Sequence, residues 1–276
     1  MSMRISKPRV SGLWVLLGVV VIGSVFPVYW TVSTSLKLRP DTFAIPPKWF
    51  FAPVIDSYTS LFSNYDVLSY LSNSVLSTLG ATLITLVAGS CAAYALSVIQ
   101  FRGRGIFLIV VVMLRMVPPI VLVTPLYQLS QDLGVFDTVW VLVLVYSGLN
   151  IPFAIWLLKG FFDDVPRELL EAGMVDGCTR FAVFRRILIP VSLPGFFATA
   201  VFTFVLCWND FLFAYMLTSS QARTLPVFAV GFMGDQGIQW GQMTAAGTVI
   251  LVPVIVFSLL VQRWLVKGLT AGGVKG

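Results

Sequence analysis

The chain has 276 residues, of which 58% are hydrophobic and 11% are charged, and its net charge is +6. This composition lies far outside the range of soluble globular domains and indicates an integral membrane protein. The sequence contains no histidine, and its cysteines, Cys91, Cys178 and Cys207, are far apart. The commonest general base and the usual metal-ligand spacings are therefore missing, which disfavours an enzyme and predicts no metal site.

Apolar segments long enough to cross a bilayer follow one another along the whole chain. We predict an all-α membrane protein with a single domain, residues 1–276, that spans the membrane six times. The predicted spans are residues 13–34, 70–98, 106–127, 138–158, 195–217 and 243–266. The first span is too long for a cleavable signal core, so it reads as a retained anchor. Residues 37–69 are polar and aromatic, and their four prolines leave room only for a short helix near residues 56–62.

The positions of the basic residues give the orientation of these spans. Thirteen of the 18 Lys and Arg residues lie in the N-terminus, the turn 100–105, the segment 159–194 or the stretch from residue 263 onward. Because cytoplasmic loops carry an excess of Lys and Arg, these parts, including both termini, are predicted to be cytoplasmic. The same bias explains the net charge of +6 without nucleic acid.

The segment 159–194 is the one long charged stretch between two strongly apolar ones. Asp163, Asp164 and Pro166 predict a helix start, and a helix to about residue 175 follows. Asp176 and Gly177 predict its end. Thr179 is a suitable cap for a second helix that reaches residue 189, where Pro190 is expected to stop it. In that helix Phe181, Phe184 and Leu188 are predicted to share one face, apart from Arg180 and Arg186. This hairpin is either a docking element for another protein or an amphipathic element that rests on lipid headgroups.

Residues in this segment match a known motif in type and spacing. They are Glu171, Ala172, Gly173, Asp176, Gly177, Ile187, Pro190 and Pro194, and together they resemble the EAA loop of ABC-importer permeases. Gly173 stands where that motif has its second alanine, a change that costs a helix up to about 1 kcal/mol. Further matches are LNIPFAIWLLKGFF at 149–162, WND at 208–210, WGQ at 240–242 and the ending QRWLVKGLTAGGVKG. The chain is identified as similar to the smaller membrane subunit of maltose-type transporters, in the carbohydrate-uptake family.

This resemblance implies the type I importer fold and a set of partners. They are a second related permease, two cytoplasmic ATPase subunits, an extracytoplasmic sugar-binding protein and membrane lipid, in a bacterial inner membrane. By resemblance, the EAA loop is a coupling helix that docks on the ATPase through Glu168, Glu171, Ala172, Gly173, Met174, Asp176, Gly177, Phe181 and Pro190. The tail 267–276 resembles one that reaches toward the ATPase dimer. The chain has no GxxxxGK[ST] sequence, so ATP and Mg are expected to bind to partner subunits and no cofactor to this chain.

Polar residues within the predicted spans are candidates for the pore lining. Arg115 is the most conspicuous, because a charge inside a span is expensive and usually faces protein or water. It either lines the pore or forms an internal contact, for example with Asp210, or reaches toward the cytoplasm. The other candidates are Asn150, Trp208, Asn209 and Asp210, whose amide, carboxylate and aromatic groups suit a sugar. Hydrogen bonding between helices explains Asn150 equally well.

The sequence thus predicts a non-catalytic permease subunit of an ATP-driven, binding-protein-dependent sugar importer. It forms half of the translocation pore and receives work from the ATPases through the segment 159–194. The alternative is a stand-alone secondary transporter or channel for a small polar solute. That class usually shows internal repeats and paired intramembrane carboxylates, for which Asp210 alone is thin support.

Overall fold

The computed structural model describes residues 8–99, 101–234 and 237–272, with side chains described for 12–99, 101–234 and 237–262. The basic residues Arg4 and Lys7 and the last four residues of the predicted tail lie outside the described residues. The described chain is almost entirely helical and divides into two compact units. The first comprises Met1–Val67 and Phe228–Leu251, and the second comprises Leu68–Val227 and Val252–Gly276.

The first unit holds the N-terminal helix and a set of short elements. Its helices are α1 (Pro8–Ser35), α2 (Arg39–Thr42), α3 (Asp56–Asn64) and the first part of α14 (Trp240–Gly272), with a hairpin of β1 (Met233–Gly234) and β2 (Gly237–Ile238). Helix α3 confirms the short helix predicted near residues 56–62. Lys37 is buried and lies over the rings of Trp30 and Phe51, at 4.7 and 5.1 Å from their centroids. Cation–π contacts therefore hold its charge at the end of α1.

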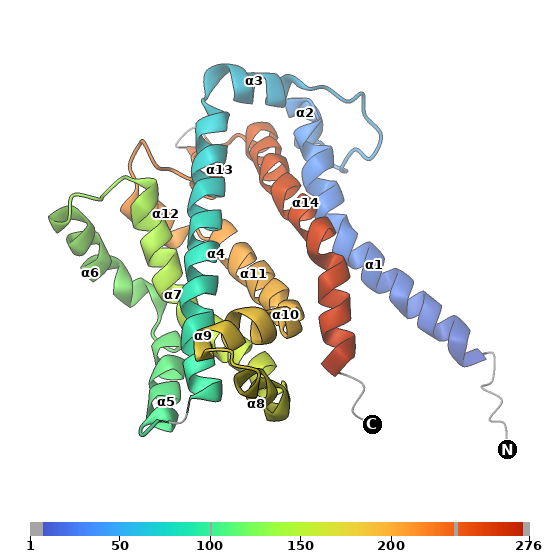
Figure 1. The fold of residues 1–276 in the computed structure, drawn as a ribbon. Helices are drawn as coiled ribbons and strands as arrows, with labels where there is room; N and C mark the ends of the chain where they lie inside the picture. The colour runs from blue at the N-terminus through green and yellow to red at the C-terminus, as the bar shows by residue number, and fades with distance from the viewer. Residues whose placement is uncertain (1–7, 100, 235–236, 273–276) are drawn as a thin grey trace. The chain divides into compact units, whose positions relative to one another are not determined.

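The second unit is a helical bundle built around α7 (Val139–Asp163) (Figure 1). The long helix α4 (Val67–Val98) lies beside α7, and α5 (Arg104–Arg115), α11 (Leu193–Trp208) and α12 (Leu212–Leu217) also pack on it. Helix α6 (Pro119–Asp132) packs on α12, and α13 (Leu225–Val230) begins in this unit. Eleven residues of α7 are buried, from Val141 to Phe162. Helix α7 is therefore the central support of the bundle.

Small residues let α4 approach α7 closely. A Cβ atom at Gly89 would lie 2.8 Å from the Cβ of Ala154, closer than two carbon atoms can pack. On the same helix, Ala93 is fully buried in a cluster with Leu158 and Phe162. These small side chains therefore allow close packing of the two helices.

The third, fifth and sixth predicted spans differ from the observed helices. Helices α1, α4, α7 and α14 are each long and apolar enough to cross a membrane. The third predicted span, residues 106–127, is instead divided between α5 and α6, which meet at 92°. Pro118 and Pro119 explain the bend, because proline at position 118 keeps an extended backbone and proline at 119 starts the next helix. By length and composition the described helices allow four to six spans, so six remains a prediction.

The last predicted spans also end differently. The fifth, residues 195–217, contains α11 and the separate short helix α12, because Asp210 accepts hydrogen bonds from the N–H groups of Phe213 and Ala214 and starts a new helix. The sixth continues as α14 to Gly272, beyond its predicted end at residue 266. In the second unit, Phe257 of α14 stacks on Phe204 of α11 with ring centroids 4.0 Å apart.

A single carboxylate fixes the loop between α12 and α13. Asp137 has a left-handed backbone, with φ of 56°, and its oxygens accept hydrogen bonds from the N–H groups of Ser219, Ser220, Gln221 and Ala222 at 2.8–3.2 Å. Partial burial by itself raises the pKa of Asp137, but these four donors outweigh it and bring the pKa from 3.8 to about 2. The ionised form of Asp137 is therefore the form that holds the loop.

We expect this loop to open in acid. Because the pKa is lower in the folded protein, the contribution of Asp137 to stability is complete above about pH 4 and disappears as the pH falls toward about 2. Hydrogen-exchange protection of the amides at 219–222, corrected for intrinsic rates, should fall over that interval. Asp137→Asn keeps a side chain that tolerates the left-handed backbone but should remove this pH dependence. The control variant Asp132→Asn should retain the pH dependence. If protection at 219–222 fell with pH in Asp137→Asn as much as in the unmodified protein, Asp137 would not be the group that holds the loop.

Candidate functional site

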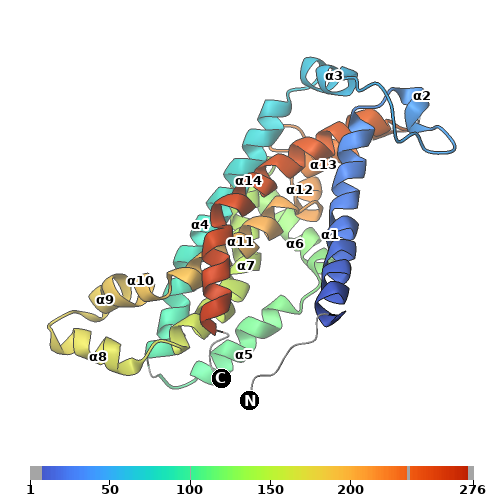
Figure 2. The ribbon, with the colours of Figure 1, turned by 90° about the vertical axis from the view of Figure 1, so that its right-hand side faces the viewer.

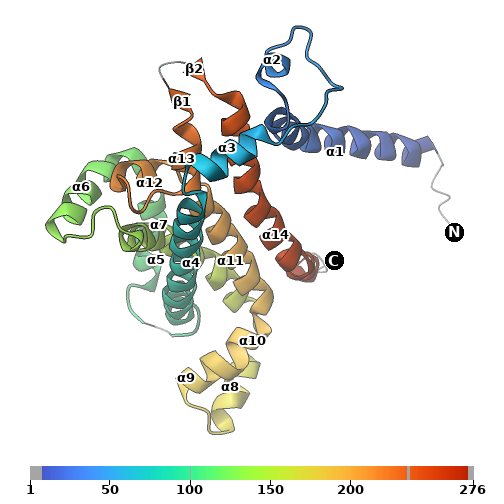
Figure 3. The same ribbon diagram turned by 90° about the horizontal axis from the view of Figure 1, so that it is seen from above.

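The segment 159–194 forms a helical projection from one end of the second unit (Figures 2 and 3). It contains α8 (Arg167–Val175), α9 (Arg180–Val183), the π-helix η1 (Phe184–Leu188) and α10 (Ile189–Val191). We call these elements the coupling loop. Asp163 does not start α8 as predicted but is the last residue of α7, because its carboxylate is bound by Ser97 and Lys159. Pro166 precedes the first residue of α8.

The turn between α8 and α9 has the predicted form. Gly177 adopts a positive φ of 85°, and the N–H of Cys178 bonds the carbonyl oxygen of Gly173 at 3.0 Å. This left-handed residue and the backward hydrogen bond end the helix in the manner of a glycine C-cap. Thr179 then caps α9, since its Oγ1 accepts a hydrogen bond from the N–H of Ala182 at 3.2 Å. The two local signals in the sequence are confirmed.

The second helix does not stop at Pro190 as predicted. Residues 184–188 widen into a π-turn, in which the N–H of Ile189 bonds the carbonyl oxygen of Phe184, five residues earlier. The altered hydrogen-bond pattern admits a proline near the start of α10, which continues to Val191. The predicted apolar face is also different, since Phe184 and Leu188 are buried but Phe181 is 67% exposed.

Gly173 is the point of closest approach between the two arms of the coupling loop. It is buried, and a Cβ at this position would overlap the Cδ1 of Ile187 in the π-helix. Glycine at this position of the EAA pattern thus leaves room for the end of the Ile187 side chain. Leu170 and Val183, also buried, complete the packing between the arms.

The outer surface of the coupling loop mixes apolar and acidic groups. Val175 is 87% exposed and Phe181 67% exposed, and Leu169 and Met174 are each 43% exposed. Ala172, Pro190, Glu168, Glu171 and Asp176 are exposed as well. We call the exposed residues 168–181 the docking face. Leu169 and Val175 belong to the docking face, although neither was predicted from the sequence to be a docking residue. Their spacing from Glu168 and Glu171 in the sequence does not indicate that they are exposed.

Aromatic and polar contacts hold the coupling loop to α4 and α7. The hydroxyl of Tyr94 donates to the carbonyl oxygen of Arg180 at 3.0 Å, and its ring lies 4.9 Å from that of Phe184. Phe184 in turn meets Phe162 of α7 edge to face. Ser97 of α4 donates to Asp163 at 2.5 Å. The loop is therefore a rigid extension of the bundle.

Arg115 makes an internal contact at the end of α5. Its Nη1 donates to the carbonyl oxygen of Leu149 at 2.9 Å, and its guanidinium carbon lies 5.5 Å from the centroid of the Phe153 ring. Pro152 lies inside this part of α7, where a proline disturbs the helical hydrogen bonds. Among the described side chains, Arg115 forms no ion pair with Asp210, whose carboxylate starts α12 instead. The Arg115 side chain is nevertheless exposed when this chain is considered by itself.

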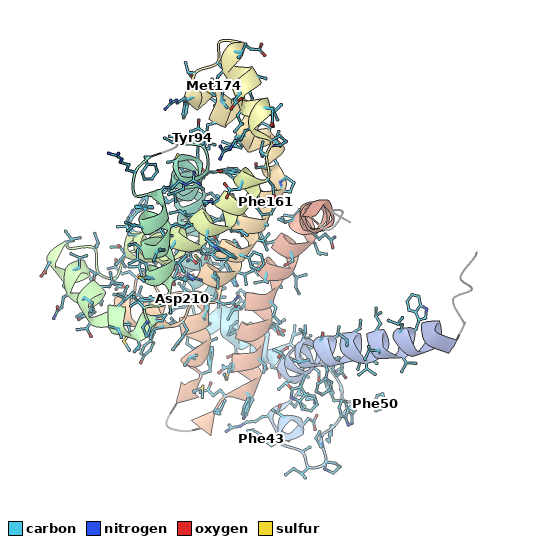
Figure 4. The ribbon with its side chains drawn as sticks, turned by 90° about the horizontal axis from the view of Figure 1, so that it is seen from below. Phe43, Phe50, Tyr94, Phe161, Met174 and Asp210 are labelled. Carbon is cyan, nitrogen blue, oxygen red and sulfur yellow. The ribbon has the colours of Figure 1, made fainter. Side chains whose placement is uncertain are left out.

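The other polar candidates lie around the junction of α7 and α11. Asn150 is buried, and its Nδ2 donates to the carbonyl oxygen of Tyr146 at 2.9 Å and to the Sγ of Cys207 at 3.4 Å. Trp208 is 1% exposed and stacks on Phe204. Asn209 is exposed, and its Nδ2 donates a hydrogen bond to the carbonyl oxygen of Val205, one turn earlier in the chain. Asp210, labelled in Figure 4, directly follows Asn209 in the chain.

Replacing Arg115 by glutamine should affect stability more than substrate binding. The variant loses a charge-assisted hydrogen bond to Leu149, which is worth about 1.5–3 kcal/mol. We expect a lower melting temperature of the purified transporter with an unchanged KM for uptake. A KM raised tenfold at unchanged melting temperature would instead identify Arg115 as a substrate ligand.

Comparisons with known proteins agree with these features. Residues 85–271 match the family described as binding-protein-dependent transport system inner membrane component. The diacetylchitobiose uptake system permease protein DasC of Streptomyces coelicolor is 34% identical, over 94% of both chains. The trehalose transport system permease protein SugB of Mycobacterium tuberculosis is 37% identical, over 95% of this chain and 97% of SugB.

A solved structure has the same fold. It is the crystal structure of a bacterial ABC transporter involved in the import of the acidic polysaccharide alginate, with a TM-score of 0.78 and 19% identity over 95% of this chain and 99% of that chain. The all-α, type I importer permease fold is thereby confirmed. The chain belongs to the family of binding-protein-dependent transport system inner membrane components, the permease subunits of ABC importers.

Proposed function

We propose that this chain is the membrane-spanning permease subunit of an ATP-driven importer that carries a sugar. The observation that carries the proposal is the rigidly held docking face, with its exposed apolar and acidic residues around Gly177, in a chain of this family. The substrate class follows the names of relatives that handle diacetylchitobiose and trehalose. A disaccharide or a related small sugar is therefore the proposed cargo.

The proposed assembly contains several other chains. They are a second related permease, which completes the pore, two cytoplasmic ATPase subunits and an extracytoplasmic sugar-binding protein. ATP and Mg belong to the ATPases, because this sequence has no phosphate-binding loop. The family supports a location in a bacterial inner membrane, and the charge bias supports termini and a coupling loop on the cytoplasmic side. The exposed apolar surface of α1, from Leu13 to Phe26, suits lipid or the second permease.

The coupling loop is proposed to work as a lever. When the ATPases close, they displace the docking face, and the contacts of Tyr94 and Phe184 carry the displacement into α4 and α7. Rigid-body motion of these helices then changes access to the pore from one side of the membrane to the other. The chain supplies mechanical connection and a pathway, and the partners supply the chemical step.

The pore lining is proposed to include Arg115, Asn209 and Asp210, with Asn150 and Trp208 behind them. Arg115 and Asn209 are exposed within this chain, which suits a surface shared with the pore or the second permease. Asn150 and Trp208 are buried, so their proposed contribution is to hold α11 against α7.

Reconstitution tests the proposed function directly. Liposomes with the complete assembly should take up a labelled sugar only with ATP and the binding protein, and the sugar itself is identified by screening ligands of the purified binding protein. Liposomes that contain this chain alone should show no uptake. Uptake by the chain alone without ATP would favour the secondary transporter or channel.

A further inference from the structure

A cavity of about 470 Å³ lies between the coupling loop and the ends of the helices that support it. Its walls come from the last turn of α4, the first residue of α5, the end of α7, and α8 and α9. In Figure 4, Tyr94 and Met174 mark its α4 side and its α8 side. This volume lies within the range of small-molecule sites in proteins. The tip of the docking face, Val175–Gly177 and Phe181, does not line the cavity.

Three arginines line the cavity from three separate helices. They are Arg104 at the start of α5, Arg167 at the start of α8 and Arg180 at the start of α9. Arg104 makes one long hydrogen bond, 3.4 Å, to the carbonyl oxygen of Ser97. In the described part of the chain, the guanidinium groups of Arg167 and Arg180 form no ion pair. Segments that are distant in the sequence thus direct cationic side chains to one place.

The two carboxylates of the cavity do not balance these charges. Asp163 is already bound by Ser97 and by Lys159, and Lys159 lies outside the lining. Glu171 is the second carboxylate, on the exposed side of α8. With Asp163 neutralised by Lys159, three guanidinium groups face one carboxylate. A ligand with a negative charge would therefore be attracted.

Apart from Tyr94 and Ser97, the remaining lining residues are apolar. Val98, Ile99 and Val183 line the cavity, together with the buried ring of Phe162 and with Leu170. A free inorganic anion gains nothing from contact with these apolar side chains. An amphiphile with a charged headgroup can place its glycerol and chain carbons against them. Basic pockets between helices at the cytoplasmic surface of a membrane bind the phosphates of acidic lipids.

We propose that this cavity binds the phosphate-bearing headgroup of an acidic phospholipid and thereby couples the lipid to the position of the coupling loop. The inference goes beyond the proposed function, although it takes the cytoplasmic side of the membrane from it. Arg104 belongs to the bundle, and Arg167 and Arg180 belong to the coupling loop. A phosphate held by all three would add a further contact between the loop and the bundle.

The test measures retention of lipid by the purified assembled transporter. With nanodiscs that contain mixtures of phosphatidylglycerol and phosphatidylcholine, native mass spectrometry should show preferential retention of phosphatidylglycerol. The triple variant Arg104→Gln/Arg167→Gln/Arg180→Gln should lose that preference, by about fivefold for each arginine. The matched control is Arg185→Gln/Arg186→Gln, two exposed arginines of the same loop that do not line the cavity. Equal losses in the triple variant and the control would overturn the proposal, because general surface charge would then explain the preference.

Two further measurements separate the sources of the phosphate and guard against misfolding. A photoactivatable phosphatidylglycerol should label residues 94–99 and 167–183, and labelling elsewhere only would overturn the site. Millimolar inorganic phosphate should leave the labelling unchanged, and its loss would assign the cavity to a soluble phosphate instead. Neither measurement uses ATP or sugar, so the proposed transport function stands or falls separately.

Discussion

Replacing Gly177 by valine is expected to abolish copurification of the ATPase and ATP-driven uptake while the chain still inserts and folds. Gly177 has a φ of 85°, and a β-branched residue in this region costs about 1–3 kcal/mol. No atom lies within 4 Å of a Cβ built there, so the added Cβ itself would clash with no group of this chain. The substitution should therefore distort the turn and weaken the contact with the ATPase. Pull-down of the ATPase measures the binding, and uptake by the reconstituted transporter measures the transport.

A second glycine provides a matched control for this experiment. Gly134, between α6 and α7, also has a positive φ, 66°, and also has open space around its Cβ position. Gly134→Val therefore imposes a similar backbone strain far from the coupling loop in the sequence, and it should leave ATPase binding intact. Wild-type assembly and transport in Gly177→Val, or equal failure in both variants, would contradict the assignment of the docking face.

Replacing Gly89 by leucine is expected to cause the largest loss of stability. The Cβ alone would lie 2.8 Å from the Cβ of Ala154, and the alanine methyl group cannot rotate away, so α4 and α7 must separate. Overpacking of this kind costs about 1–3 kcal/mol or more. The purified transporter should aggregate at a temperature several degrees lower, measured by size-exclusion chromatography after heating.

The control for Gly89→Leu lies on the other helix of the pair. Gly148 of α7 has no atom within 4 Å of its Cβ position, so Gly148→Leu should change the aggregation temperature little. If Gly89→Leu were as stable as Gly148→Leu, the close approach of α4 to α7 would be wrong.

Local signals in the sequence were sufficient for the turn of the coupling loop. Gly177 and Thr179 act through atoms within five residues of themselves, and both behave as predicted. Asp163 and Pro190 were interpreted wrongly, each for a different reason. The carboxylate of Asp163 serves Ser97, which is 66 residues away, and Pro190 is accommodated by a π-turn that no propensity scale encodes.

Interactions between distant segments explain what the sequence could not predict. The contact of Asp137 with residues 219–222 joins positions more than 80 residues apart. The cavity needs α4, α5, α7, α8 and α9 at once, so its arginines appear in the sequence only as scattered positive charges. The family resemblance, by contrast, rests on spacing within single segments, which is why it could be recognised before the fold was known.

The close contact of Gly173 with Ile187 has a mechanical consequence for the coupling loop. Because Gly173 packs directly against Ile187 and the N–H of Cys178 bonds back to Gly173, the two arms are held together at this level of the loop. A displacement applied at its tip is then delivered to the base at nearly full amplitude instead of being absorbed as bending. An alanine at position 173 would require the flexible end of the Ile187 side chain to shift, whereas glycine lets the two arms pack without that adjustment.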